Sequence, residues 1–255
     1  MMGGKGKTAL IRLGSIFGCL VFWEVTSRFV PMGLFPGLRE TFDAFYDNLV
    51  QGVLLVNLGV TTRRVFVGFL VALLIGAIMG LFMGLKRVVE DSLTYPMLFA
   101  MSIPSLAWVI LGLMWFGLTE FAGIFVISAI VFPIVVINTY EGVKGVDKTF
   151  IEMAQAYKAS QCKIIFEIIL PSTFPYILSA CRFGIGVAWK IAIIAEMLGM
   201  SLGVGYQLKY YYSLSRMDQV LAWILVFTLA IFIVDRFVLA RISALVLRWR
   251  PNVAL

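Results

Sequence analysis

Three charged residues, Arg182, Lys190 and Glu196, lie inside an apolar segment, 174–200, that is long enough to cross a membrane. Each unpaired charge at the centre of a bilayer costs on the order of 3 kcal/mol, so each needs a partner or water. On a helix, Arg182, Trp189 and Glu196 share one face, and Lys190 lies at its margin. Arg182 and Glu196 are about 21 Å apart along that helix and cannot pair with each other. Such residues indicate either a path for a charged solute or ion pairs with other helices.

The functional interpretation is that this face lines a translocation pathway between two copies of the chain, with Glu196 near an outer gate. Fixed cations at Lys190 and Arg182 would favour anions such as carboxylates and sulfonates. The structural alternative places Arg182 at the lipid headgroups and lets Glu196 accept hydrogen bonds from another span. Trp108 and Trp189 admit the same two interpretations, gate or packing, and packing is favoured.

A second feature is the polar insert 149–171, which separates two apolar runs and whose charges should keep it in water. Thr149 and Glu152 have the spacing of a capping box, which predicts the start of a short amphipathic helix. Ser160 can cap a second helix whose isoleucines form one apolar face, and Pro171 is expected to end it. The insert is therefore predicted to form two short helices outside the bilayer, each with an apolar side.

The composition is that of an integral membrane protein. Of the 255 residues, 61% are hydrophobic and 14% are charged, far from soluble globular usage. We expect one all-α membrane domain, 1–255. The chain has no histidine and its three cysteines lack metal-ligand spacing, so no metal or other cofactor is expected. No phosphate-binding loop is complete, so we expect no ATPase and no catalytic residue in this chain. The net charge of +7 is attributed to membrane orientation rather than to a nucleic acid partner.

Six apolar segments are predicted to cross the membrane as helices. Lysine and arginine are about twice as frequent on the side of the N-terminus and the polar insert as on the other side, which places both termini and the insert in the cytoplasm. Pro96 and Pro104 predict kinks or a break in the third span. The segment 201–217 is expected to be an outer loop. The predicted spans are about 9–30, 65–85, 93–116, 121–138, 174–200 and 220–247.

The predicted second span carries a small residue at every fourth position. Such a series forms a groove along one helix face and allows close helix packing. The partner is either a helix of the same chain, which is favoured, or a helix of a second copy. The small residues are Gly68, Ala72, Gly76, Gly80 and Gly84.

The polar insert resembles the signature loop of ABC importer permeases, which reads Glu-Ala-Ala, three residues, Gly, nine residues, Ile, one residue, Leu-Pro. The chain follows this pattern except at two positions, where Met153 replaces an alanine and Lys158 replaces the glycine. Because a residue with a Cβ turns less freely than glycine, Lys158 puts the turn geometry in question. In that family the loop couples the permease to an ATP-binding subunit. The resemblance assigns this role to Glu152, Met153, Ala154, Lys158, Ile168, Leu170 and Pro171.

Further short segments between about residues 55 and 250 are similar, in the same order, to the permease branch for nitrate, sulfonates, taurine and bicarbonate. They are 64–69, 104–108, 115–117 and 203–206. The resemblance implies an importer of a small anionic solute in the bacterial plasma (inner) membrane. Its expected parts are two copies of this chain, two ATP-binding subunits that hold ATP and Mg, and a periplasmic or lipid-anchored substrate-binding protein.

Two alternatives remain open on the sequence alone. A secondary transporter would use Glu196 as a proton or sodium site and the broken third span for its substrate. A membrane scaffold without transport activity would use the insert only as a docking platform. The lack of repeated broken-helix halves argues against the first alternative, and the charges within the spans argue against the second.

Overall fold

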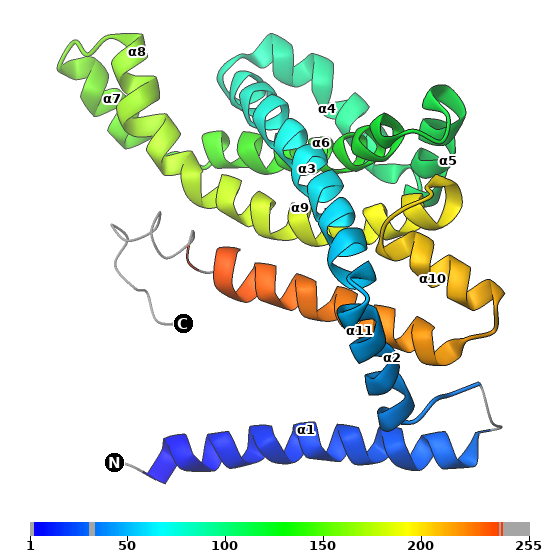
Figure 1. The fold of residues 1–255 in the computed structure, drawn as a ribbon. Helices are drawn as coiled ribbons and strands as arrows, with labels where there is room; N and C mark the ends of the chain where they lie inside the picture. The colour runs from blue at the N-terminus through cyan, green and yellow to red at the C-terminus, as the bar shows by residue number, and fades with distance from the viewer. Residues whose placement is uncertain (1–2, 31–33, 240, 242–255) are drawn as a thin grey trace.

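The fold is helical throughout the part of the chain that the structure describes (Figure 1). The computed structural model describes residues 3–30, 34–239 and 241, and no strand occurs among them, so the predicted all-α class is confirmed. Two π-helical segments, Ile165–Ile169 and Val234–Leu239, continue α8 and α11. The α-helices are α1 (Gly3–Phe29), α2 (Leu38–Val50), α3 (Val53–Leu85), α4 (Arg87–Ser102), α5 (Ser105–Phe116), α6 (Glu120–Lys144), α7 (Lys148–Ala156), α8 (Gln161–Ile164), α9 (Leu170–Gly199), α10 (Val204–Ser213) and α11 (Met217–Ile233).

Four helical segments are long and apolar enough to cross a membrane, and they contain α3, α6, α9 and α11. A fifth span is formed if α4 and α5, which meet at an angle of 96°, count as one broken span. The predicted first span, 9–30, corresponds to α1, a helix of 27 residues. Six crossings and cytoplasmic termini remain predictions. The end of the predicted sixth span lies outside the described residues.

Several predicted boundaries are wrong. α3 begins at Val53 rather than near residue 65, and the polar side chains of its first half, Asn57, Thr61 and Arg64, have partners in α9 and in the turn between α9 and α10. The segment 201–217, expected to be a loop, contains α10. The chain breaks between α4 and α5 at Pro104, as its proline predicts, whereas Pro96 lies within α4.

The core is built on close packing between α3 and α6. A Cβ atom at Gly68 would lie 2.8 Å from the Ile127 side chain, and one at Gly80 would lie 2.5 Å from the Val136 carbonyl oxygen. Residues without a side chain therefore let these helices approach each other closely. The groove of small residues packs within the chain, which confirms the favoured alternative.

The insert and the last turn of α9 lie at opposite ends of the helix bundle (Figure 1). Figure 1 shows α9 running from α8 at one end of the molecule to α10 at the other. The start of α1 and the described end of α11 lie on the same side of this view as α7 and α8. The insert therefore projects from one end, and the last turn of α9 reaches the opposite end.

Candidate coupling surface and membrane-embedded charges

The first helix of the insert, α7, is capped by Asp147, which lies two residues before the expected capping residue Thr149. The Asp147 carboxylate accepts a hydrogen bond from the backbone N–H of Thr149 at 2.9 Å. This bond and a second one from the Thr149 side chain hold the pKa of Asp147 below its ordinary value. The predicted capping box of Thr149 and Glu152 is therefore wrong, because Thr149 already lies in the first turn.

The turn between α7 and α8 keeps a glycine-like backbone although Lys158 occupies it. Lys158 has φ of 57°, in the left-handed region. Its N–H donates to the Gln155 carbonyl at 2.8 Å, and the N–H of Ala159 donates to the Ala154 carbonyl at 3.0 Å. This pair of bonds is the Schellman arrangement, in which glycine usually takes the left-handed position. The substitution therefore preserves the turn geometry, at the cost of local backbone strain.

The second helix of the insert runs directly into the fifth span. Ser160 caps α8 as predicted, since its hydroxyl oxygen accepts from the Lys163 N–H at 3.3 Å. The prediction that Pro171 ends this helix is wrong. The Leu170 N–H bonds to the Ile165 carbonyl in a widened π-helical turn, and α9 continues through Pro171 to Gly199. A widened turn accommodates a proline, which lacks the N–H of a regular helix.

The two helices of the insert have a packed side and an exposed side. On the packed side, Ile164 and Ile169 form one hydrophobic cluster with Val143 at the end of α6, and Leu81 and Leu85 at the end of α3 pack against this cluster. The exposed side carries a group of apolar residues, which we call the coupling surface, made of two α7 residues, the C-cap residue of α7 and one residue of the π-helical segment. Its members are Phe150, Met153, Tyr157 and Phe166, with exposed fractions of 54%, 52%, 84% and 67%.

The residues of the resembling loop are divided between these two sides. Glu152, Met153 and Lys158 are exposed. The remaining members are half-buried: Ala154, Ile168, Leu170 and Pro171. The insert therefore offers an exposed apolar surface whose back is attached to three membrane-crossing helices.

The charged residues of α9 do not share one open face. Arg182 and Lys190 are exposed, whereas Trp189 and Glu196 are buried. The Trp189 ring packs against Phe227 of α11, with centroids 6.0 Å apart. Trp189 and Glu196 are therefore buried inside the subunit, in keeping with the packing interpretation of Trp189 and the structural alternative for Glu196. Trp108 is half-buried, and its indole N–H donates to the Ala100 carbonyl at 3.3 Å.

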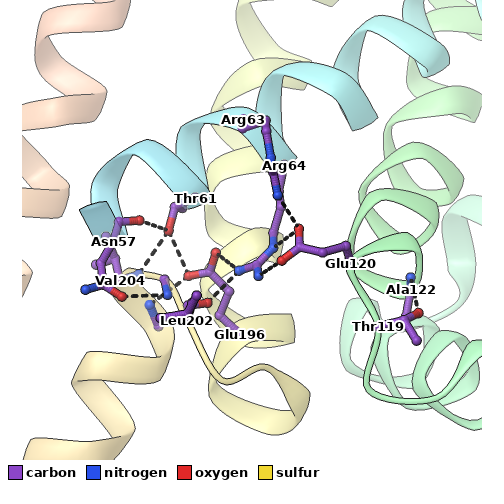
Figure 2. A network of polar contacts seen from close by, with 12 residues as sticks. Asn57, Thr61, Arg63, Arg64, Thr119, Glu120, Ala122, Glu196, Leu202 and Val204 are labelled. Carbon is purple, nitrogen blue, oxygen red and sulfur yellow. Dashed lines mark hydrogen bonds and ion pairs between the residues drawn. The ribbon is translucent and has the colours of Figure 1, made fainter. Parts of the chain in front are cut away.

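The Glu196 carboxylate pairs with the guanidinium of Arg64 on α3 (Figure 2). Nη1 of Arg64 lies 2.7 Å from Oε1 of Glu196 and 2.6 Å from the Leu202 carbonyl oxygen. Nε of the same guanidinium lies 2.9 Å from Oε2 of Glu120 on α6. Only 3% of the Arg64 side chain and none of the Glu196 side chain is exposed. Arg64 thus joins three helices and lies between two carboxylates.

Glu196 also fixes the turn between α9 and α10. Its Oε2 accepts hydrogen bonds from the Thr61 hydroxyl and from the Gly205 N–H, each at 2.9 Å. The N–H of Gly203, whose φ is 122°, donates to Oδ1 of Asn57 at 2.8 Å. Each oxygen of Glu196 therefore has a partner, as a buried carboxylate requires. This pairing counters the alternative in which Glu196 is a free proton or sodium site.

Sequence reasoning missed Arg64, because the helix was expected to begin just after it. A signal was present: Asn57, Thr61 and Arg64 follow each other at intervals of four and three residues, which is the spacing of one helix face. Among the described residues, no group of histidine, cysteine, aspartate and glutamate is arranged to hold a metal ion.

Comparison with known proteins places the chain in a family. Residues 72–245 match the family described as "Binding-protein-dependent transport system inner membrane component". An ABC transporter permease protein of Methanocaldococcus jannaschii is 36% identical over 224 residues, which are 85% of this chain and 84% of the relative. An aliphatic sulfonates transport permease protein of Bacillus subtilis is 31% identical over 208 residues, 82% of this chain and 75% of the relative.

Two further proteins extend this comparison. A bicarbonate transport system permease protein of Synechococcus elongatus is 30% identical over 241 residues, which are 90% of this chain and 86% of the relative. The inward-facing MetNI methionine ABC transporter shares the fold, with a TM-score of 0.69 at 14% identity over 77% of this chain and 97% of that chain. The chain therefore belongs to the family of binding-protein-dependent transport system inner membrane components, the permease subunits of ABC importers, in which a separate subunit binds ATP.

Proposed function

We propose that two copies of this chain form the membrane path of an importer in the plasma (inner) membrane, with α1 as a sixth span and both termini in the cytoplasm. Two ATP-binding subunits, carrying ATP and Mg, dock on the coupling surface, and an external substrate-binding protein delivers the solute. The observation that carries this proposal is the group of exposed apolar residues on α7 and its C-cap, Phe150, Met153 and Tyr157, in a polar insert outside the spans. Exposed apolar groups clustered in this way mark a site of protein contact.

The attachment of the insert suggests how closure of the ATP-binding subunits reaches the membrane. A push on α7 would pass through Ile151 and Ala154 to the ends of α3 and α6. A push on α8 would pass directly into α9, because the helix is continuous through the π-helical turn. Movement of these helices would open the path alternately to the two sides of the membrane.

The transported solute is proposed to be a small anion. Relatives are named as permeases for aliphatic sulfonates and for bicarbonate. In this chain the exposed charges of α9, Arg182 and Lys190, are both cationic. Cations along a membrane path attract anions and oppose the passage of cations.

Purification from the native membrane in mild detergent, followed by mass spectrometry, tests the docking. We expect an ATP-binding subunit in amounts equal to the permease. Phe150→Asp and Tyr157→Asp should remove it, because each places a charge in an apolar contact. Val88→Asp is the matched control, since Val88 is 78% exposed near the start of α4 but lies outside the coupling surface. Retention of the subunit by both aspartate variants would contradict the proposal.

A further inference from the structure

A cavity of about 340 Å³ opens at the break between α4 and α5. Its polar edge contains Ser102 and Ser105, and its apolar walls contain Ile130 and Ile134 of α6 and Phe183 of α9. Non-helical backbone is tolerated at membrane depth only where protein buries it or where it lines a water-filled cavity. Both serines are exposed. The break therefore indicates access of water to this place in the broken span.

Lys190 lies on the same face of α9 as Phe183. Seven residues make about two helical turns, so Lys190 follows Phe183 by about 10 Å along the axis and points in nearly the same direction. Gly186, between them, has no atom within 4 Å of the position that a Cβ would take, so the face between the two residues is open. The Lys190 side chain is exposed and makes no hydrogen bond or ion pair with any other described residue. An ammonium group without a partner inside a span requires water or an anion.

We propose that the cavity is a transit site for an organic anion, with its carbon chain against Ile130, Ile134 and Phe183 and its acidic head directed toward Lys190. An inorganic anion gains nothing from three apolar walls, whereas a short carbon chain loses contact with water there. The chemical class that fits is therefore an anion with an aliphatic part, such as an alkanesulfonate or a short carboxylate. This inference rests on the proposed function as an anion importer.

Cysteine accessibility in the complete importer, reconstituted in vesicles, tests the site. Cys19, Cys162 and Cys181 are first replaced by alanine, and ATP-driven uptake of butanesulfonate is measured. Ser105→Cys is then treated with two methanethiosulfonate reagents of similar size, one anionic (sulfonatoethyl) and one cationic (trimethylammonioethyl). Ser92→Cys is the control, because Ser92 is exposed on α4 but does not line the cavity. Ser102→Cys supplies a second cavity position if Ser105→Cys does not fold.

We expect the anionic reagent to react preferentially at Ser105→Cys compared with Ser92→Cys. Lys190→Met should reduce this preference by about fivefold, the effect of one charge several ångströms away in a partly hydrated site. Butanesulfonate should slow the reaction more than nitrate does. The inference is overturned if the cavity cysteines do not react, if Lys190→Met leaves the preference unchanged, or if nitrate protects as well as butanesulfonate. Uptake of nitrate or bicarbonate without uptake of butanesulfonate would also overturn the inference, whereas absence of ATP-driven uptake of all these anions in the starting complex would contradict the proposed function, and the accessibility result would still be read independently.

Discussion

Replacement of Arg64 by methionine removes the cation that lies between two carboxylates. In the wild-type protein, Glu196 is neutralised by this guanidinium at 2.7 Å and also accepts from Thr61 and Gly205. In Arg64→Met the two neutral donors remain, but the buried charge has no counterion, and the Leu202 carbonyl loses its donor. Breaking a buried ion pair by removing one partner costs about 3–5 kcal/mol, so this variant should unfold far more easily.

The reverse change, Glu196→Gln, should cost less. The glutamine carbonyl can still accept from Thr61 and Gly205, and Arg64 keeps Glu120 as its counterion. The main loss is the hydrogen bond between Arg64 and Glu196, because the glutamine amide N–H and the Arg64 N–H are both donors and now face each other. This loss should cost about 1–3 kcal/mol of folding stability. Once Arg64 has been replaced by methionine, however, the same glutamine removes the unpaired charge. Glu196→Gln should therefore destabilise the wild-type protein and stabilise Arg64→Met.

This reversal of sign is measurable from unfolding midpoints of the four proteins in one detergent. Arg63→Met is the control, because Arg63 also bonds Glu120, at 3.0 Å, but 64% of its side chain is exposed. An exposed ion pair of this kind contributes about 1 kcal/mol or less. If Glu196→Gln shifts the midpoint in the same direction with and without Arg64, the two residues do not act as a pair and the reasoning is refuted.

Three further predictions concern single positions. Lys158→Gly relieves the left-handed backbone at φ 57° and should stabilise the turn by about 1 kcal/mol, seen as slower hydrogen exchange in α7; faster exchange would contradict this. Asp147→Ala should speed hydrogen exchange in the first turn of α7, and Asp147→Asn should return the exchange rate toward that of the wild-type protein. Because the pKa of Asp147 is lowered, the carboxylate cap persists at neutral pH and weakens only as the pH falls through that lowered pKa. Gly80→Val should abolish folded protein in detergent, because its Cβ would meet the α6 backbone at 2.5 Å, whereas Gly59→Val on the same helix, with no atom within 4 Å, should be tolerated; equal yields would refute the packing argument.

Local patterns in the sequence were sufficient for the class of protein and for most helices. Long apolar runs predict membrane helices because a helix satisfies its own backbone hydrogen bonds in lipid. The spacing of Gly68, Gly76 and Gly80 predicted close packing, and Ser160 predicted the start of α8. The signature of the insert, although altered at Met153 and Lys158, identified the permease family because it depends on order and spacing along the chain.

Local rules failed where packing decided the outcome. Pro171 is an ordinary stop signal, yet α9 runs through it because the preceding turn widens to π-helical geometry. The polar residues in the first half of α3 lay outside the predicted second span, because their partners lie on other helices. No local pattern reports those partners.

The charges of α9 show most clearly what the sequence determines and what only the tertiary structure decides. The sequence determined that Arg182, Lys190 and Glu196 lie in one membrane helix and that each needs a partner or water, since periodicity and desolvation are properties of a single segment. Only the tertiary structure decided which charge received which environment. Glu196 meets Arg64 across 132 residues of sequence, while Lys190 remains on an exposed face. The physical reason is that the orientation of a helix face is fixed by the neighbouring helices that pack against it, and these come from distant parts of the chain.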